Sequence, residues 1–141
     1  AELIKARTRD LGLDGVVEWR GRVTPEEVSK SIAAASCLVH PSEREGYGLV
    51  VVEAAFLGTP SILVEGPENA ATELIEDGLN GLVAASASPD NLAGAIIESV
   101  RRGTEFRQRT LAWYERHRDE LSIESSLGQV ERSYSTVGED R

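Results

Sequence analysis

The chain has 141 residues, of which 40% are apolar and 28% are charged, and its formal net charge is −9. This length predicts a single domain, 1–141, that buries about two-thirds of its extended surface, and the composition is that of an ordinary soluble protein. The acidic balance argues against nucleic acid as a partner, because nucleic-acid binding requires a basic surface.

Several features of the sequence indicate a cytoplasmic protein. No apolar run is long enough to span a membrane, and no basic-then-apolar leader is present. The one cysteine, Cys37, lies in an apolar run typical of a core thiol, and no internal disulfide is expected. The start at Ala1 and the absence of methionine suggest a piece of a longer protein.

The first forty residues predict two helices and two strands. An amphipathic helix over 1–11 ends at Gly12, and a short strand follows over 16–19. The run Thr24-Pro25-Glu26-Glu27 predicts the start of a second helix, because it combines a capping threonine, proline at the first helical position and two acids. An apolar strand over 37–40 then ends before a proline.

The stretch 41–60 predicts a turn followed by a buried helix. Gly46 and Gly48 allow the backbone to turn tightly and to approach a ligand. In the helix expected over 49–57, the only polar residue is Glu53. The pattern therefore predicts a helix that is buried all round, with a carboxylate that needs a partner.

The turn and the start of this helix together predict an anion-binding site. Backbone N–H groups at a helix start have no intrahelical acceptor, and they attract negatively charged groups. Glu45 lies in the turn and Glu53 about one turn inside the helix, so both carboxylates would flank that spot and accept bonds from sugar hydroxyls. A sugar phosphate or a nucleotide-sugar would satisfy all of these groups.

The remainder of the chain continues the alternation of strands and helices. Strands are expected over 61–64 and 81–84, a short helix over 70–76, and a longer helix from Ser88 onward. Terminal helices over 103–135 are expected to pack on the sheet. Four strands alternating with helices predict an α/β fold with a Rossmann-like parallel sheet, right-handed crossovers and helices on both faces.

The pattern Ser42-x-x-Glu45-Gly-Tyr-Gly-Leu-x-x-x-Glu53-Ala-x-x-x-Gly58-Thr-Pro60 resembles the signature of the retaining glycosyltransferases of the family 4 type, also called group 1 glycosyl transferases. Members of that family have two Rossmann-like domains in an architecture called GT-B. The resemblance implies that the chain is the C-terminal, donor-binding domain, truncated at its N-terminal side. About two strands, and an Arg and a Lys that clamp the donor phosphates, would then precede it.

The resemblance also implies a function and a set of site residues. The enzyme would transfer a hexose from a nucleoside-diphosphate sugar to an acceptor held by an absent N-terminal domain or subunit, and this chain alone would be inactive. Glu45 would bind the transferred sugar and stabilise its developing positive charge. Glu53 would hold the ribose, and Arg22 and Val23 the base. Further contacts to the diphosphate and the sugar would come from Ser42, Gly46, Tyr47, Gly48, Leu49 and Val50.

Two alternative functions stay open at this point. In a nucleotide-sugar epimerase, His40 and Glu45 would be the pair that transfers protons. A non-catalytic module would instead pair with a partner through an open sheet edge.

Glu73 is either a helix residue or a ligand, because the loop before it lacks the glycine pair usual in the family. Neither a metal nor another cofactor is expected, and membrane association would come only through the missing domain.

Overall fold

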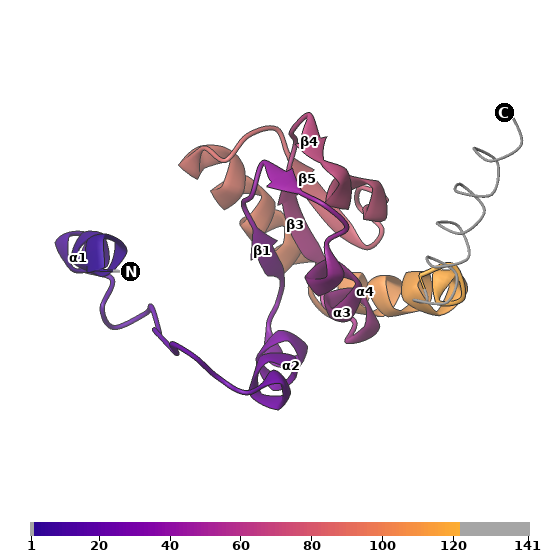
Figure 1. Ribbon diagram of the computed structural model, residues 1–141, viewed down its shortest axis with the longest axis horizontal. Helices are drawn as coiled ribbons and strands as arrows, with labels where there is room; N and C mark the ends of the chain where they lie inside the picture. Colours follow the sequence, from indigo (N-terminus) through magenta and orange to yellow (C-terminus); the bar gives the residue numbers. More distant parts are fainter. Residues whose placement is uncertain (1, 122–141) are drawn as a thin grey trace, which may run out of the picture.

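The computed structural model describes residues 2–121, and a three-stranded parallel sheet forms its centre (Figure 1). The order of strands is β1 (Leu38–His40), β3 (Ser61–Val64) and β5 (Gly81–Ala84). In the register, Ser61 lies opposite both Leu38 and Gly81. These are the strands predicted over 37–40, 61–64 and 81–84, and their parallel arrangement confirms the predicted fold class.

A second, two-stranded parallel sheet lies beyond the carboxyl ends of the first. It pairs β2 (Arg44–Glu45) with β4 (Glu68–Asn69), so that Glu45 lies opposite Asn69. The sequence analysis missed both strands, because two residues are too few to produce an alternation of apolar and polar side chains. This small sheet joins the turn after β1 to the loop after β3.

Helices cover both faces of the central sheet, because neighbouring residues of a strand point to opposite sides. On one face, Leu63 packs against α3 (Leu49–Phe56) and the 3-10 helix η1 (Ala70–Leu74). On the other face, Ile62 packs against α4 (Pro89–His117). Cys37 packs against this second cluster, and burial raises the pKa of its thiol, as expected for a core cysteine.

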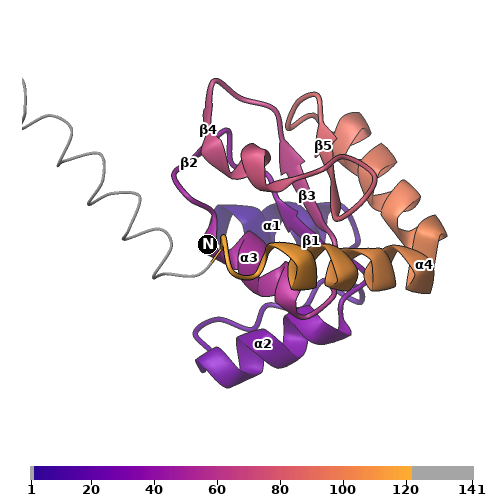
Figure 2. The ribbon, with the colours of Figure 1, turned by 90° about the vertical axis from the view of Figure 1, so that its right-hand side faces the viewer.

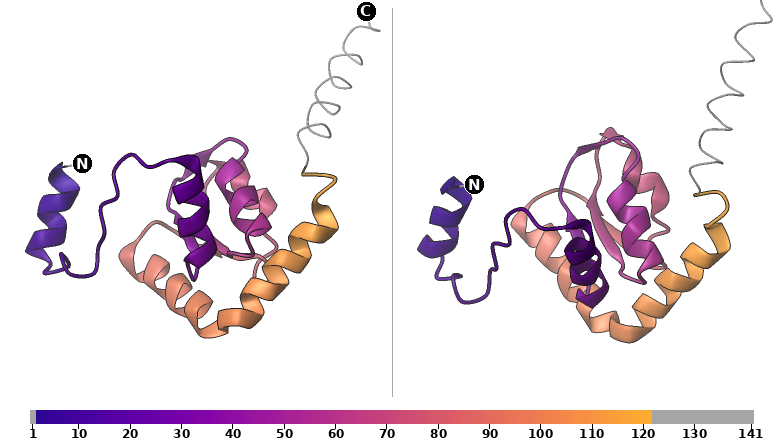
Figure 3. Two further views of the ribbon diagram at one scale, coloured as in Figure 1. Left: turned by 90° about the horizontal axis from the view of Figure 1, so that it is seen from below. Right: turned by 60° about the horizontal axis from the view of Figure 1, so that its bottom comes forward.

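Helix α4 bends at Gly103 and so reaches around the sheet. Gly103 has φ 53° and ψ −135°, which interrupts the helical backbone, and the two arms of α4 form a V in Figure 3. The first arm lies on the face of Ile62, and the second lies beside α3 (Figure 2). Tyr114 of the second arm makes an edge contact with Phe56 of α3. The part of the terminal helices expected over 122–135 lies outside the described residues.

The amino-terminal part differs most from the expectation. Helix α1 (Glu2–Asp10) forms and is followed by Gly12, but it stands apart from the sheet in Figures 1 and 3, and its Leu3 is 85% exposed. The strand predicted over 16–19 is wrong: Val16 is 78% exposed, and no described residue pairs with this segment. A strand requires a neighbouring strand for its hydrogen bonds, and none is present here within residues 2–121.

Helix α2 (Pro25–Ala34) begins as predicted. The side chain of Thr24 accepts a bond from the N–H of Glu27, and the Glu27 carboxylate accepts one from the N–H of Thr24.

Within residues 2–121, no helix is long and apolar enough to cross a membrane.

Candidate functional site

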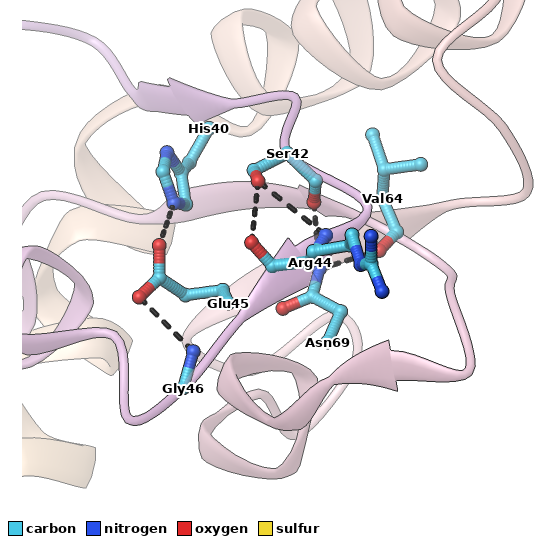
Figure 4. Close-up of polar contacts among 7 residues, drawn as sticks. All are labelled: His40, Ser42, Arg44, Glu45, Gly46, Val64 and Asn69. Atoms are coloured by element: carbon cyan, nitrogen blue, oxygen red, sulfur yellow. Dashed lines mark hydrogen bonds and ion pairs between the residues drawn. The ribbon is translucent and has the colours of Figure 1, made fainter.

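The predicted turn lies between β1 and α3, and it is held by one side chain of β4 and one of the turn itself (Figure 4). Asn69 of β4 donates bonds from Nδ2 to the carbonyl of Ser42, at 3.0 Å, and to that of Val64, at 2.8 Å. The Ser42 hydroxyl donates to the carbonyl of Arg44 at 2.7 Å. Ser42 therefore shapes the turn, and Asn69 ties the turn to the end of β3.

Glu45, the predicted catalytic residue, is held by groups on both of its carboxylate oxygens. Oε2 lies 2.8 Å from Nε2 of His40, the last residue of β1, and Oε1 accepts a bond from the N–H of Gly46 at 3.2 Å (Figure 4). The bond from His40 holds the pKa of Glu45 below its ordinary value, and the N–H groups of Gly46 and Gly48 act in the same direction. Glu45 is therefore an ionised and oriented carboxylate.

The two glycines of the turn have different structural roles. Gly48 has φ 76°, and a Cβ atom there would lie 2.6 Å from Cβ of Ala71, so only glycine fits. At Gly46, an added Cβ would meet no atom within 4 Å, so the space beside it is open. The turn is thus closed toward η1 at one glycine and open at the other.

The start of α3 leaves donors free beside Glu45. The N–H groups of Leu49 and Val50, the first two residues of the helix, have no acceptor within the described part of the chain. Such groups carry the partial positive charge of the helix dipole. The structure therefore brings a carboxylate, an open space and two free donors together in one turn.

The expectation that α3 is buried all round is wrong. Leu49 is 64% and Phe56 is 56% exposed, whereas Val51 and Ala54 on the opposite side are buried. Glu53 lies on the exposed side, and within residues 2–121 no hydrogen bond or ion pair reaches its carboxylate. The apolar sequence misled here because α3 has only one face against the sheet.

Two predicted base contacts are not brought to the turn. Arg22 is exposed and Val23 is half-buried, and both lie in the segment between α1 and α2, which Figure 1 shows running clear of the sheet. No hydrogen bond or ion pair of the described residues joins either of them to the residues of the turn. Arg44, the one cation of the turn, pairs with Glu68 across β2 and β4.

The side chain of Tyr47, which is 43% exposed, borders a cavity of about 480 Å³ between η1 and the end of α4. Glu73, Trp113 and His117 also border it, so Glu73 lies near the turn without reaching Glu45. Sequence reasoning missed Asn69 as a site-forming residue, since nothing in the local pattern distinguishes it from a loop asparagine. Within residues 2–121, no cluster of His, Cys, Asp or Glu has the arrangement of a metal site.

Comparison with known proteins gives consistent results. A D-inositol 3-phosphate glycosyltransferase of a Nocardioides species is 35% identical over 109 residues, which cover 73% of this chain and 23% of that protein. The structure of Anabaena HepE in complex with UDP matches with a TM-score of 0.79 and 22% identity, over 96% of this chain and 36% of that one. Sucrose-phosphate synthase from Thermosynechococcus elongatus matches with a TM-score of 0.70 and 24% identity, over 96% and 34%.

These matches extend over most of this chain but over less than half of each relative. The two structural matches show that the fold is that of a GT-B glycosyltransferase domain. The profile of the family described as "Glycosyl transferases group 1" matches residues 1–112. The chain therefore belongs to the group 1 glycosyl transferases.

Proposed function

We propose that this chain is the donor-side domain of a retaining glycosyltransferase and that it binds a nucleoside-diphosphate sugar at the turn between β1 and α3. The observation that carries the proposal is the juxtaposition of the oriented Glu45 carboxylate with the free N–H groups of Leu49 and Val50. A diphosphate accepts bonds from such donors, while a carboxylate accepts them from sugar hydroxyls. Membership of the family favours sugar transfer over the epimerase alternative.

In this proposal each group meets a different part of the donor. The free N–H groups of Leu49 and Val50 meet the diphosphate, and the open space at Gly46 lets the sugar approach the backbone of the turn closely. Glu45 accepts a bond from the hexose and stabilises the positive charge that develops as the glycosidic bond breaks. The exposed Glu53 holds the ribose diol. Arg22 and Val23 do not touch the turn in this structure, so we propose that their segment moves to the base when the donor binds. We infer a cytoplasmic location from the composition and the single cysteine.

The charges of the turn set a limit on affinity. Glu43, Glu45 and Glu53 are all acidic, and Arg44 is already paired with Glu68. Two phosphates therefore gain little cationic support from the described residues. We propose that a further domain or subunit, which corresponds to the part of the longer relatives that this chain does not match, supplies the remaining cations and holds the acceptor. The chain alone then binds a donor weakly and does not catalyse sugar transfer. A low-micromolar dissociation constant for the donor would contradict the weak binding.

The experiment is a two-dimensional amide NMR titration of the full chain with UDP, GDP and ADP in turn, up to millimolar concentration. UDP is added first because the HepE complex contains it. Shifts at Gly46, Gly48 and Val23 with one nucleotide are expected to identify both the site and the base. Glu53→Gln is expected to weaken that binding about tenfold, whereas Glu43→Gln is the matched control. The absence of any shift, or equal effects of the two variants, would count against the proposal.

A further inference from the structure

We propose that His40 is a positioning residue: its imidazole holds the Glu45 carboxylate in the orientation in which that carboxylate meets the donor sugar. This inference rests on the proposed function, because it assigns Glu45 a sugar to meet. It adds a residue that lies outside the signature of glycines and glutamates.

The geometry of the strand ends carries the inference. His40 is the last residue of β1 and Glu45 the last residue of β2, so both side chains stand at the carboxyl edge of the two sheets. The imidazole reaches the carboxylate at 2.8 Å on one oxygen, while the N–H of Gly46 occupies the other at 3.2 Å. With one donor on each oxygen, the carboxylate is fixed in rotation, yet each oxygen retains a lone pair for a further donor.

The exposure of the pair favours a local function over a contribution to stability. The side chains of His40 and Glu45 are 26% and 32% exposed, so neither is fully buried and solvent reaches the pair. Hydrogen bonds between side chains that water reaches add little to folding. They do reduce the rotamer freedom that a side chain would otherwise lose on binding a ligand. An ordered Glu45 therefore binds a sugar hydroxyl at a smaller entropic cost than a free one.

Among the side chains near Glu45, His40 is the one that holds the carboxylate in place. Arg44 on the same strand pairs with Glu68, and the residue beside His40 in the central sheet is Leu63, which is apolar. Asn69, opposite Glu45 in the small sheet, uses its amide donors on two backbone carbonyls. Within residues 2–121, His40 is the one side chain that donates a hydrogen bond to Glu45.

The test compares His40→Ala with His40→Gln in the full chain, with His117→Gln as the control at the other histidine. Amide NMR titrations measure the affinity for UDP and for UDP-glucose, and carbon-13 NMR measures the pKa of the Glu45 carboxyl. His40→Ala is expected to raise that pKa and to weaken UDP-glucose binding about tenfold, as loss of a hydrogen bond to a charged group does. UDP binding is expected to stay within about twofold, and His40→Gln to recover most of the UDP-glucose affinity.

The two proposals fail in different ways. If neither UDP nor UDP-glucose shifts the amides of the wild-type chain, the proposed function is refuted, and the inference about His40 with it. If both ligands bind but His40→Ala leaves the ratio of their affinities unchanged, only the inference is refuted. An equal loss of both affinities would also refute it, because His40 would then support the turn and not the sugar contact.

Discussion

The sharpest prediction for stability concerns Arg107, whose guanidinium joins the ends of two helices to α4. Its Nη2 donates to the carbonyls of Ala33, at 2.8 Å, and Leu57, at 3.3 Å, and its Nη1 donates to the carbonyl of Ala35 and to the Thr59 hydroxyl. The three carbonyls lie at the carboxyl ends of α2 and α3. A cation there also opposes the negative ends of both helix dipoles.

The cost of removing this guanidinium follows from these contacts. Arg107→Met retains much of the aliphatic chain and a similar helix propensity, so the change isolates the donors. The exposed carbonyl of Ala33 can be hydrated, but those of Ala35 and Leu57 are less accessible. At about 1–2 kcal/mol for each carbonyl left without a partner, the variant loses about 3 kcal/mol of unfolding free energy. The melting temperature then falls by roughly 10 °C.

Urea denaturation followed by circular dichroism measures this change. Arg109→Met is the matched control, because Arg109 lies on the same helix and, among the described residues, its one ion pair is with Glu105 at the surface. Such an exposed pair contributes about 0.5 kcal/mol or less. The reasoning is refuted if Arg107→Met and Arg109→Met lower the free energy of unfolding equally, or if the first costs less than about 1 kcal/mol.

Three further predictions concern the turn and the helix starts. Gly48→Ala forces a Cβ against Ala71 at a positive φ and is expected to cost about 2–4 kcal/mol, whereas Gly46→Ala costs less than about 0.5 kcal/mol; thermal melts compare the two. Thr24→Ala removes the hydroxyl that accepts the bond from the N–H of Glu27 at the start of α2, and it is expected to cost about 1 kcal/mol in urea denaturation. The lowered pKa of Glu45 stabilises the fold above the pKa of an unfolded glutamate, about 4.3, and this contribution disappears as the pH falls through the folded value. Between pH 6 and pH 3 the wild type should therefore lose more stability than Glu45→Gln.

Features encoded locally were predictable from the sequence. The cap of α2 depends on residues three apart, and the positive φ of Gly48 depends on one residue and its neighbours. The place of Glu45 beside the start of α3 follows from the same short stretch. These features need no knowledge of distant contacts, because turn chemistry and helix capping act over a few residues.

Features that depend on distant partners were not predictable. The segment 16–19 has the composition of a strand, but a strand forms only beside another one, and no described segment pairs with it. The pairing of Glu45 with Asn69, and the reach of Arg107 to Ala35, join residues that are 24 and 72 positions apart. The sequence suggests His40 only as a proton-transfer partner of Glu45 in an epimerase, because the distance between the two side chains depends on how the turn folds.

The bend of α4 has a consequence for how the domain unfolds. A straight helix of 29 residues would be about 44 Å long and would leave the sheet after its first arm. Because the glycine at 103 turns the chain, one continuous element contacts the cluster around Ile62 and then α3, which covers the cluster around Leu63. If one of these contacts is lost, the other loses its support, so we expect the two hydrophobic clusters to unfold as one cooperative unit in a single transition.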